Sequence, residues 1–185
     1  MKKIYISADQ LLSDSYALAA QIFDSGFKPD LIVGVWRGGA PVAIAVQEYL
    51  DYLGVYSDHI AIRANSYKGV DDRKDRVQLD GMEYLFDRLG QSRQLLILDD
   101  VFDTGRSVEA ITRQIIQKSD NAKTQTIKVA CPWYKPSRNL TDLQPDFHIH
   151  ETADWLVFPH ELKGLTREEL IEGKGDLVKS LLDRI

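Results

Sequence analysis

The chain has 185 residues, a net charge of −5, 44% hydrophobic residues and 28% charged residues. This length and composition predict one globular domain spanning residues 1–185. The acidic balance argues against broad binding to nucleic acid or to an anionic membrane, and no apolar run approaches the roughly 18 residues that cross a bilayer. Cys131 is the only cysteine, so an intrachain disulfide and a cysteine metal cluster are excluded, and we expect a reducing, cytoplasmic setting.

Helical and strand patterns alternate along the chain. Helix-period apolar spacing predicts a helix over residues 7–26, and DLIVGV (30–35) predicts a buried strand that leads through Arg37-Gly38-Gly39 into a helix at 41–53. The next expected elements are a strand at 59–64, a helix at 83–89, a strand at 94–98, a helix at 105–118, a strand at 126–134 and short strands at 147–150 and 155–158. This order predicts an α/β fold with a central, mainly parallel sheet flanked by helices. The terminal segments are expected to form a small hood over one edge.

Two of the predicted strands end in unusual loops. Trp36-Arg37-Gly38-Gly39 follows the strand at 30–35, and residues 99–107 follow the strand at 94–98. Ligands of open parallel sheets bind beyond the carboxyl ends of the strands. If the two strands are neighbours, both loops lie at the same end of the sheet, and we expect the site there.

The stretch LLILDDVFDTGRS (95–107) gathers three carboxylates within five positions, Asp99, Asp100 and Asp103. The following Thr104-Gly105-Arg106-Ser107 opens a helix and offers hydroxyls, a residue without a side chain and outward amides, a combination that suits a phosphate. A plain strand-to-helix turn with an N-cap is the alternative for this loop alone. The acids cannot bind phosphate, so we expect them to face sugar hydroxyls or a divalent cation.

The same stretch resembles the phosphoribosyl pyrophosphate (PRPP) motif of the type I phosphoribosyltransferases. The resemblance implies that Asp99 and Asp100 hold the ribose 2′- and 3′-hydroxyls, and that the loop from Asp103 through Thr104, Gly105 and Arg106 to Ser107 binds the 5′-phosphate. It also implies Mg²⁺ as cofactor, and Asp103 as the catalytic residue that manages the purine N7 proton.

Two further segments resemble parts of this family. Arg37-Gly38-Gly39 resembles the pyrophosphate loop, which implies a cis peptide at Trp36–Arg37; a plain turn is the alternative. Ser66-Tyr67 opens the polar stretch SYKGVDDRKDRVQ and resembles the loop that closes over PRPP. A solvated charge run is the alternative there.

The resemblance is to the 6-oxopurine (hypoxanthine and xanthine-guanine) group. Lys135 stands where that group places the lysine that donates to purine O6, with Lys128 a weaker candidate. In DWLVFPHE (154–161), Trp155 matches the stacking residue and Leu156 the edge contact, whereas Glu161 matches an acid near the exocyclic 2-position or the metal. Without its flanking matches, Trp155 reads as an ordinary core aromatic. The family often has two adjacent basic residues after this lysine, whereas here Pro136 and Ser137 intervene before Arg138.

The resemblance therefore implies transfer of the 5-phosphoribosyl group from PRPP to N9 of hypoxanthine, guanine or xanthine. It implies small-molecule partners, no nucleic acid or membrane partner, and a homo-oligomer, either a dimer or a tetramer. Two alternatives stay open: a non-catalytic nucleotide-sensing regulator with the same fold, and an orotate- or adenine-type enzyme. Lys135 argues against the adenine type, because adenine has no oxo group for a lysine to meet.

Overall fold

The computed structural model describes residues 2–67, 76–118, 125–175, 178 and 180. The chain divides into two compact units. The core unit comprises residues 14–153, and the terminal unit comprises residues 1–13 and 154–185.

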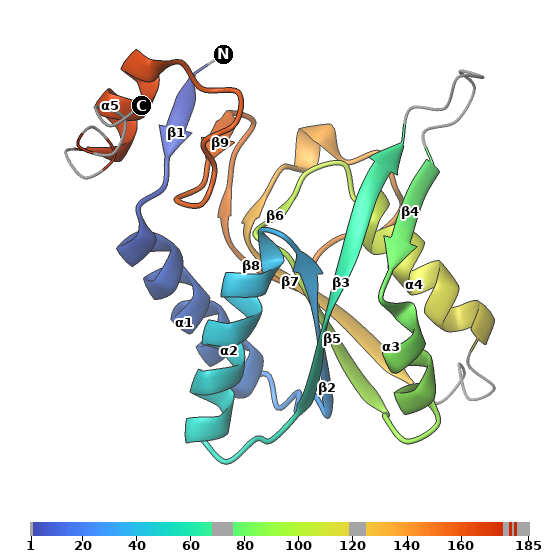
Figure 1. The fold of residues 1–185 in the computed structure, drawn as a ribbon. Helices are drawn as coiled ribbons and strands as arrows, with labels where there is room; N and C mark the ends of the chain where they lie inside the picture. Colours follow the sequence, from blue (N-terminus) through green and yellow to red (C-terminus); the bar gives the residue numbers. More distant parts are fainter. Residues whose placement is uncertain (1, 68–75, 119–124, 176–177, 179, 181–185) are drawn as a thin grey trace. The chain divides into compact units, whose positions relative to one another are not determined.

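The core unit is built on a seven-stranded sheet whose order is β4-β3-β2-β5-β7-β6, with β8 also pairing with β7 (Figure 1). The strands are β2 (Leu31–Trp36), β3 (Asp58–Tyr67), β4 (Arg76–Asp80), β5 (Gln94–Leu98), β6 (Val101–Phe102), β7 (Thr126–Tyr134) and β8 (Phe147–Glu151). All neighbours pair in parallel except β3 and β4, which are antiparallel. The sheet is therefore mainly parallel, as the continuous aliphatic strands predicted.

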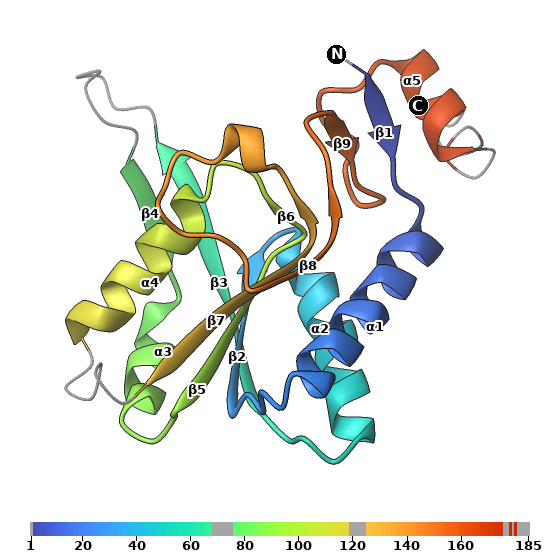
Figure 2. The same cartoon turned by 180° about the vertical axis from the view of Figure 1, so that it is seen from behind.

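Helices cover both faces of this sheet. The helices are α1 (Ala8–Asp24), α2 (Gly39–Tyr52), α3 (Met82–Leu89) and α4 (Arg106–Lys118), and a short 3₁₀ turn, η1 (Pro136–Arg138), follows β7. Figures 1 and 2 show α3 and α4 on one face, and α2 with the core-unit part of α1 on the other. Tyr16 of α1 and Tyr49 of α2 are in ring contact, 5.8 Å between centroids.

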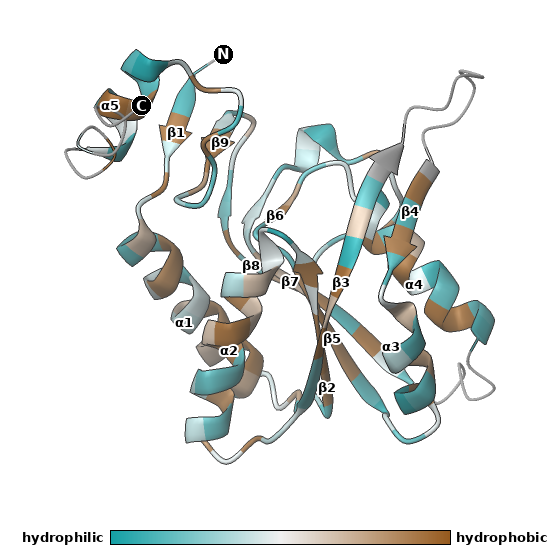
Figure 3. Cartoon of the chain, in the orientation of Figure 1, coloured by the Kyte–Doolittle hydropathy of each residue, from teal (hydrophilic) through white to brown (hydrophobic). Residues whose placement is uncertain are grey.

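The hydrophobic core lies between the sheet and its helices, and Figure 3 shows the apolar colouring concentrated along β2 and β5. Leu31, Val33, Leu95 and Ile97 are fully buried on the side of α3 and α4, and the residues that alternate with them, Ile32, Leu96 and Leu98, are buried as well. Strands buried on both faces explain why these segments are continuously aliphatic. Each such side chain stabilises the fold by about 1.5–3 kcal/mol when fully buried.

On one side of β7, its neighbour in the sheet is not one continuous strand but two strands, β5 and β6, with a two-residue gap between them. β5 and β6 pair with β7 in a single register, Leu98 with Ala130 and Val101 with Trp133. Asp99 and Asp100 lie in the gap, opposite Cys131 and Pro132. Pro132 has no backbone N–H, so β7 cannot donate a ladder hydrogen bond at this position, beside the two acids.

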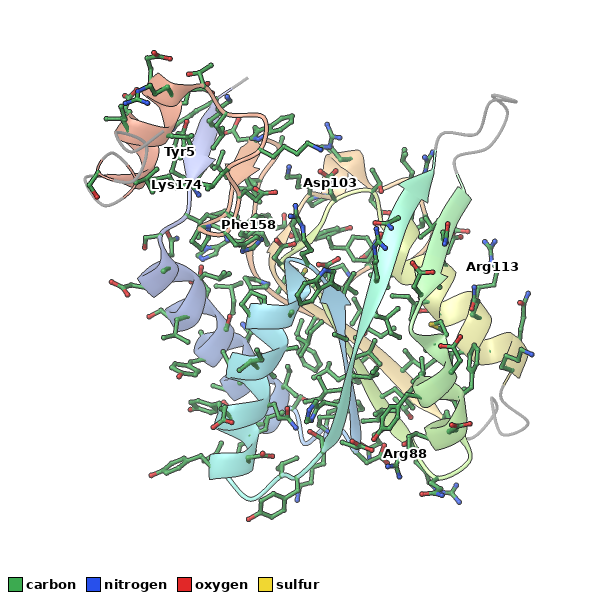
Figure 4. The ribbon with its side chains drawn as sticks, viewed as in Figure 1. Tyr5, Arg88, Asp103, Arg113, Phe158 and Lys174 are labelled. Carbon is green, nitrogen blue, oxygen red and sulfur yellow. The ribbon has the colours of Figure 1, made fainter. Side chains whose placement is uncertain are left out.

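The terminal unit pairs β1 (Lys3–Tyr5) in parallel with β9 (Trp155–Val157) and adds α5 (Arg167–Lys174). Thr166 and Glu169 form a capping box at the start of α5, and Glu169 also binds Lys3. The Tyr5 ring packs directly on Gly173, and Lys174 donates to the carbonyl of Phe158; Tyr5, Phe158 and Lys174 are labelled in Figure 4. The two ends of the chain thus form one small folded unit.

The structure confirms the predicted fold class and each predicted helix and strand, with shifts of a few residues at most ends. Strands β1, β4 and β6 and helix α5 were not predicted. β4 follows the charge run at 68–75, which lies outside the described residues, and β1 and β6 are too short to carry a period. The single-domain assignment stays a prediction. None of the helices in the described part of the chain has the length and apolar character needed to cross a membrane.

A polar cluster joins the start of β3 to α3. Tyr84 donates to the Asp58 carboxylate at 2.7 Å, and Arg88 lies 3.1 Å from the same carboxylate oxygen. The hydrogen bond from Tyr84 is the main cause of a lowered Asp58 pKa, whose ordinary value is 3.8. The stabilisation is therefore present above that value and disappears as the pH falls through the lower, folded-state pKa.

We expect Tyr84→Phe to lower the free energy of unfolding at neutral pH by a small amount, because the pair is largely exposed to solvent. The difference from the unmodified protein should begin to shrink as the pH falls below 3.8, because Asp58 then takes up a proton in the unfolded state before it does so, at its lower pKa, in the folded state. Urea unfolding followed by circular dichroism at pH 7 and pH 3.5 measures both values. An equal difference at the two pH values would contradict the assignment.

Candidate active site

The site candidates of the core unit meet at one edge of the sheet, where β2, β5 and β7 end. β2 and β5 are parallel neighbours, as are β5 and β7, so the segments that follow them lie side by side. We call this end the carboxyl edge. Among the described residues, three buried side chains are polar or charged, and two of them, Asp100 and Lys135, lie here. Buried charge is costly, so its concentration at one edge indicates a functional site.

Two glycines bring the loop after β2 against the acids after β5. A Cβ placed on Gly38 would lie 1.9 Å from Oδ2 of Asp100, and one on Gly39 would lie 2.3 Å from the carbonyl oxygen of Leu98. No other residue fits in either place without displacing the acids. The peptide bond between Trp36 and Arg37, directly before these glycines, is cis, as the resemblance predicted.

The side chains of Asp99 and Asp100 have little contact with solvent. The Asp100 side chain is nearly buried, the Asp99 side chain is partly buried, and Oδ1 of Asp99 accepts from the Asp100 amide at 2.9 Å. Burial, and then the charge of Asp100, raise the pKa of Asp99 well above its usual range. Two adjacent carboxylates with this little solvent favour a cation or several hydroxyl donors beside them.

The turn from Asp103 to Ser107 joins β6 to α4 and is shaped by Gly105. Gly105 has φ +76°, and a Cβ there would lie 2.5 Å from Oγ1 of Thr141 and 2.8 Å from the Phe102 ring. The Leu140 amide donates to the Thr104 carbonyl at 3.1 Å, which ties this turn to the segment after η1. The start of α4 therefore presents its amides at the carboxyl edge, an arrangement suited to an anion.

Asp103 stands between two cations. Its Oδ2 lies 3.3 Å from Nζ of Lys135, and its Oδ1 accepts from Nε of Arg138 at 2.6 Å. Figure 4 labels Asp103 at the end of the sheet toward which the strand arrows of β2 and β5 point. Lys135 follows the last residue of β7, and its amide donates to the Phe102 carbonyl at 2.9 Å. Sequence reasoning placed Asp103 and Lys135 in one site, but gave Arg138 no role in it.

The remaining predicted site residues lie on β3 or in the terminal unit. Ser66 and Tyr67 are the last residues of β3, which runs parallel to β2, and they pair with β4. Trp155, Leu156 and Glu161 belong to the terminal unit. There Trp155 is 56% exposed, which disagrees with an ordinary core aromatic, whereas Leu156 is buried. Glu161 accepts from the Phe158 amide at 3.0 Å.

Comparison with known proteins gives the family. Residues 7–164 match the phosphoribosyl transferase domain. The chain is a member of the phosphoribosyl transferase family. It is 32% identical over 174 residues to a xanthine-guanine phosphoribosyltransferase of Desulfotalea psychrophila, covering 92% of this chain and 94% of that protein. It is 30% identical over 170 residues to the xanthine-guanine phosphoribosyltransferase of Roseobacter denitrificans, covering 87% and 86%.

Solved structures of the phosphoribosyl transferase family share the architecture. A purine phosphoribosyltransferase from Pyrococcus horikoshii matches with a TM-score of 0.69 at 27% identity, covering 90% of this chain and 99% of that one. The Helicobacter pylori xanthine-guanine-hypoxanthine phosphoribosyltransferase matches with a TM-score of 0.70 at 19% identity, covering 98% and 99%, which is a likeness of fold.

We expect Gly38→Ala to lower PRPP affinity strongly, because its methyl group would occupy the position of the Asp100 carboxylate. Isothermal titration with PRPP and Mg²⁺ measures the affinity. Gly54→Ala serves as the control, since a Cβ on Gly54 meets no atom within 4 Å, although its φ of +80° adds backbone strain. Unchanged PRPP affinity in Gly38→Ala would remove this loop from the site.

Proposed function

We propose that this protein transfers the 5-phosphoribosyl group from PRPP to N9 of a 6-oxopurine base and releases pyrophosphate. The observation that carries the proposal is the meeting of three parts at the carboxyl edge. These parts are the acid pair, the turn before α4 whose amides suit an anion, and the Lys135–Asp103 pair, whose charged atoms lie 3.3 Å apart. The relatives named xanthine-guanine and hypoxanthine-guanine phosphoribosyltransferase support the same reaction.

PRPP would lie along the carboxyl edge with its ribose toward Asp99 and Asp100. Carboxylates accept hydrogen bonds from the 2′- and 3′-hydroxyls, which offsets the cost of holding two acids in this partly buried place. The 5′-phosphate would accept hydrogen bonds from the backbone and hydroxyl groups between Thr104 and Ser107. Arg37 and the adjacent glycine amides would face the pyrophosphate, where negative charge develops as the C1–oxygen bond breaks.

The acid pair also suits Mg²⁺. The ion prefers oxygen ligands and is commonly held by one or two carboxylates together with substrate phosphates. The raised pKa of Asp99 supports this fit, because a cation would offset the repulsion from Asp100. Asp99 and Asp100 would hold the ion, with Glu161 a further proposed ligand, and the bound ion would stabilise the leaving pyrophosphate.

The base would be recognised from the end of β7. Lys135 would donate to the purine O6, and Asp103 would accept or return the proton at N7 as the bond to N9 forms. Trp155 would stack on the ring and Leu156 would contact its edge through the backbone. Ser66 and Tyr67 would help to exclude water from the reacting centre. A cytoplasmic setting and a dimeric or tetrameric state are part of this proposal.

The decisive test is a spectrophotometric panel of hypoxanthine, guanine, xanthine and adenine, each with PRPP and Mg²⁺. We expect turnover with at least one 6-oxopurine and little with adenine, because adenine carries an amino group where Lys135 requires an acceptor. If no base turns over, the proposed reaction is wrong and a nucleotide-sensing regulator becomes the better reading. Adenine as the best substrate would contradict the role of Lys135.

We expect Lys135→Ala to reduce the preference for a 6-oxopurine over adenine by about 10- to 100-fold, the effect of about 1–3 kcal/mol from one buried hydrogen bond. The measurement is kcat/KM for each base. Lys128→Ala is the matched control, because Lys128 lies on β7, the strand that leads into Lys135, but packs over the rings of Phe27 and Phe147. The same loss of preference in both variants would show that Lys135 has no specific part.

A further inference from the structure

The contact between Asp103 and Arg138 has no part in the reaction proposed above. Nε of Arg138 donates to Oδ1 of Asp103 at 2.6 Å, while Lys135 approaches the other oxygen, Oδ2, at 3.3 Å. Each carboxylate oxygen therefore has its own cationic partner. A hydrogen bond between two charged groups at this distance is among the stronger kinds in proteins and restrains the rotation of the carboxylate.

Both cations come from one short segment after β7. Lys135 precedes η1 and Arg138 ends it, and the Arg138 amide donates to the Lys135 carbonyl at 3.0 Å. The side chain of Asn139 then holds the following turn, since its amide donates to the Leu143 carbonyl at 2.7 Å and its oxygen accepts from the Thr141 amide at 2.9 Å. The guanidinium of Arg138 is thus delivered to Asp103 by a turn that is itself well bonded.

The two cations differ in burial. The Lys135 side chain is 9% exposed and that of Arg138 is 47% exposed. In the proposed reaction Lys135 also donates to the base, so its ammonium group divides its donors between Asp103 and the purine O6. A carboxylate whose inner partner is shared in this way is held less firmly from that side. Arg138 approaches from the solvent side and can keep its contact while the base is bound.

We propose that Arg138 is a positioning residue that holds the Asp103 carboxylate in place while Lys135 engages the base. This inference rests on the proposed phosphoribosyl transfer. Because Oδ1 of Asp103 accepts the hydrogen bond from Nε of Arg138, Oδ2 is the oxygen that accepts or returns the N7 proton. Arg138 acts on turnover through Asp103. Its net contribution to the stability of the fold is small, because both groups are partly exposed and are solvated by water in the unfolded chain.

The first test is the kinetics of Arg138→Ala with the 6-oxopurine that the unmodified protein prefers. We expect kcat to fall about 10-fold or more, since a small misplacement of a catalytic group carries a cost of this order. KM for PRPP and the thermal midpoint should stay nearly unchanged. Arg138→Lys should restore part of the loss, because an ammonium group can still reach the carboxylate. Arg113→Ala, which removes an exposed arginine paired with Glu109 on α4, is the matched control and should behave as the unmodified protein.

The second test is a double-mutant cycle with Asp103→Asn. If Arg138 acts through Asp103, Arg138→Ala should cause little further loss of kcat in the Asp103→Asn background. Equal losses in both backgrounds, or a raised KM for PRPP with unchanged kcat, would overturn the proposal, the latter by moving Arg138 to a substrate phosphate. An unmodified protein without turnover would remove the reaction and this role together. Normal turnover in both the unmodified protein and Arg138→Ala would remove this role alone.

Discussion

The close approach of two loops is the constraint on which the candidate site depends. Gly38 and Gly39 allow the backbone after β2 to lie directly on Leu98, Asp99 and Asp100, where any side chain would collide with the acids. Backbone amides can then lie beside carboxylates with no side chain between them. A ligand that carries both hydroxyls and phosphates can meet acceptors and donors within this one place.

Strand β7 supports the same acids from within the sheet. β7 runs continuously past the gap between β5 and β6, so it supports the acid pair and continues directly into Lys135. Cys131, at the position opposite Asp99, is small and fully buried, and burial raises the pKa of its thiol. It therefore stays protonated and adds no charge beside the acids, so the charge at this edge belongs to the groups that face a ligand.

Charge is distributed unevenly along the carboxyl edge. The acids after β5 stand close together, whereas Asp103, only three residues beyond Asp100, lies between Lys135 and Arg138. The first arrangement favours a cation or hydroxyl groups, and the second favours a ring that offers both an acceptor and a proton. One short sequence stretch can thus serve the sugar and the base of the same reaction.

The sequence by itself determined the class of fold and the chemical character of the acidic stretch. Continuous aliphatic runs specify strands buried on both faces, and the series of hydrophobic residues, two acids and D-T-G-R-S is local, so it can be read without knowing what packs against it. The tertiary structure decided which groups meet. Contacts of Gly38 with Asp100, and of Arg138 with Asp103, join residues that are 62 and 35 positions apart. Such contacts depend on strand order and on the path of a short turn, neither of which leaves a periodic signal in the chain.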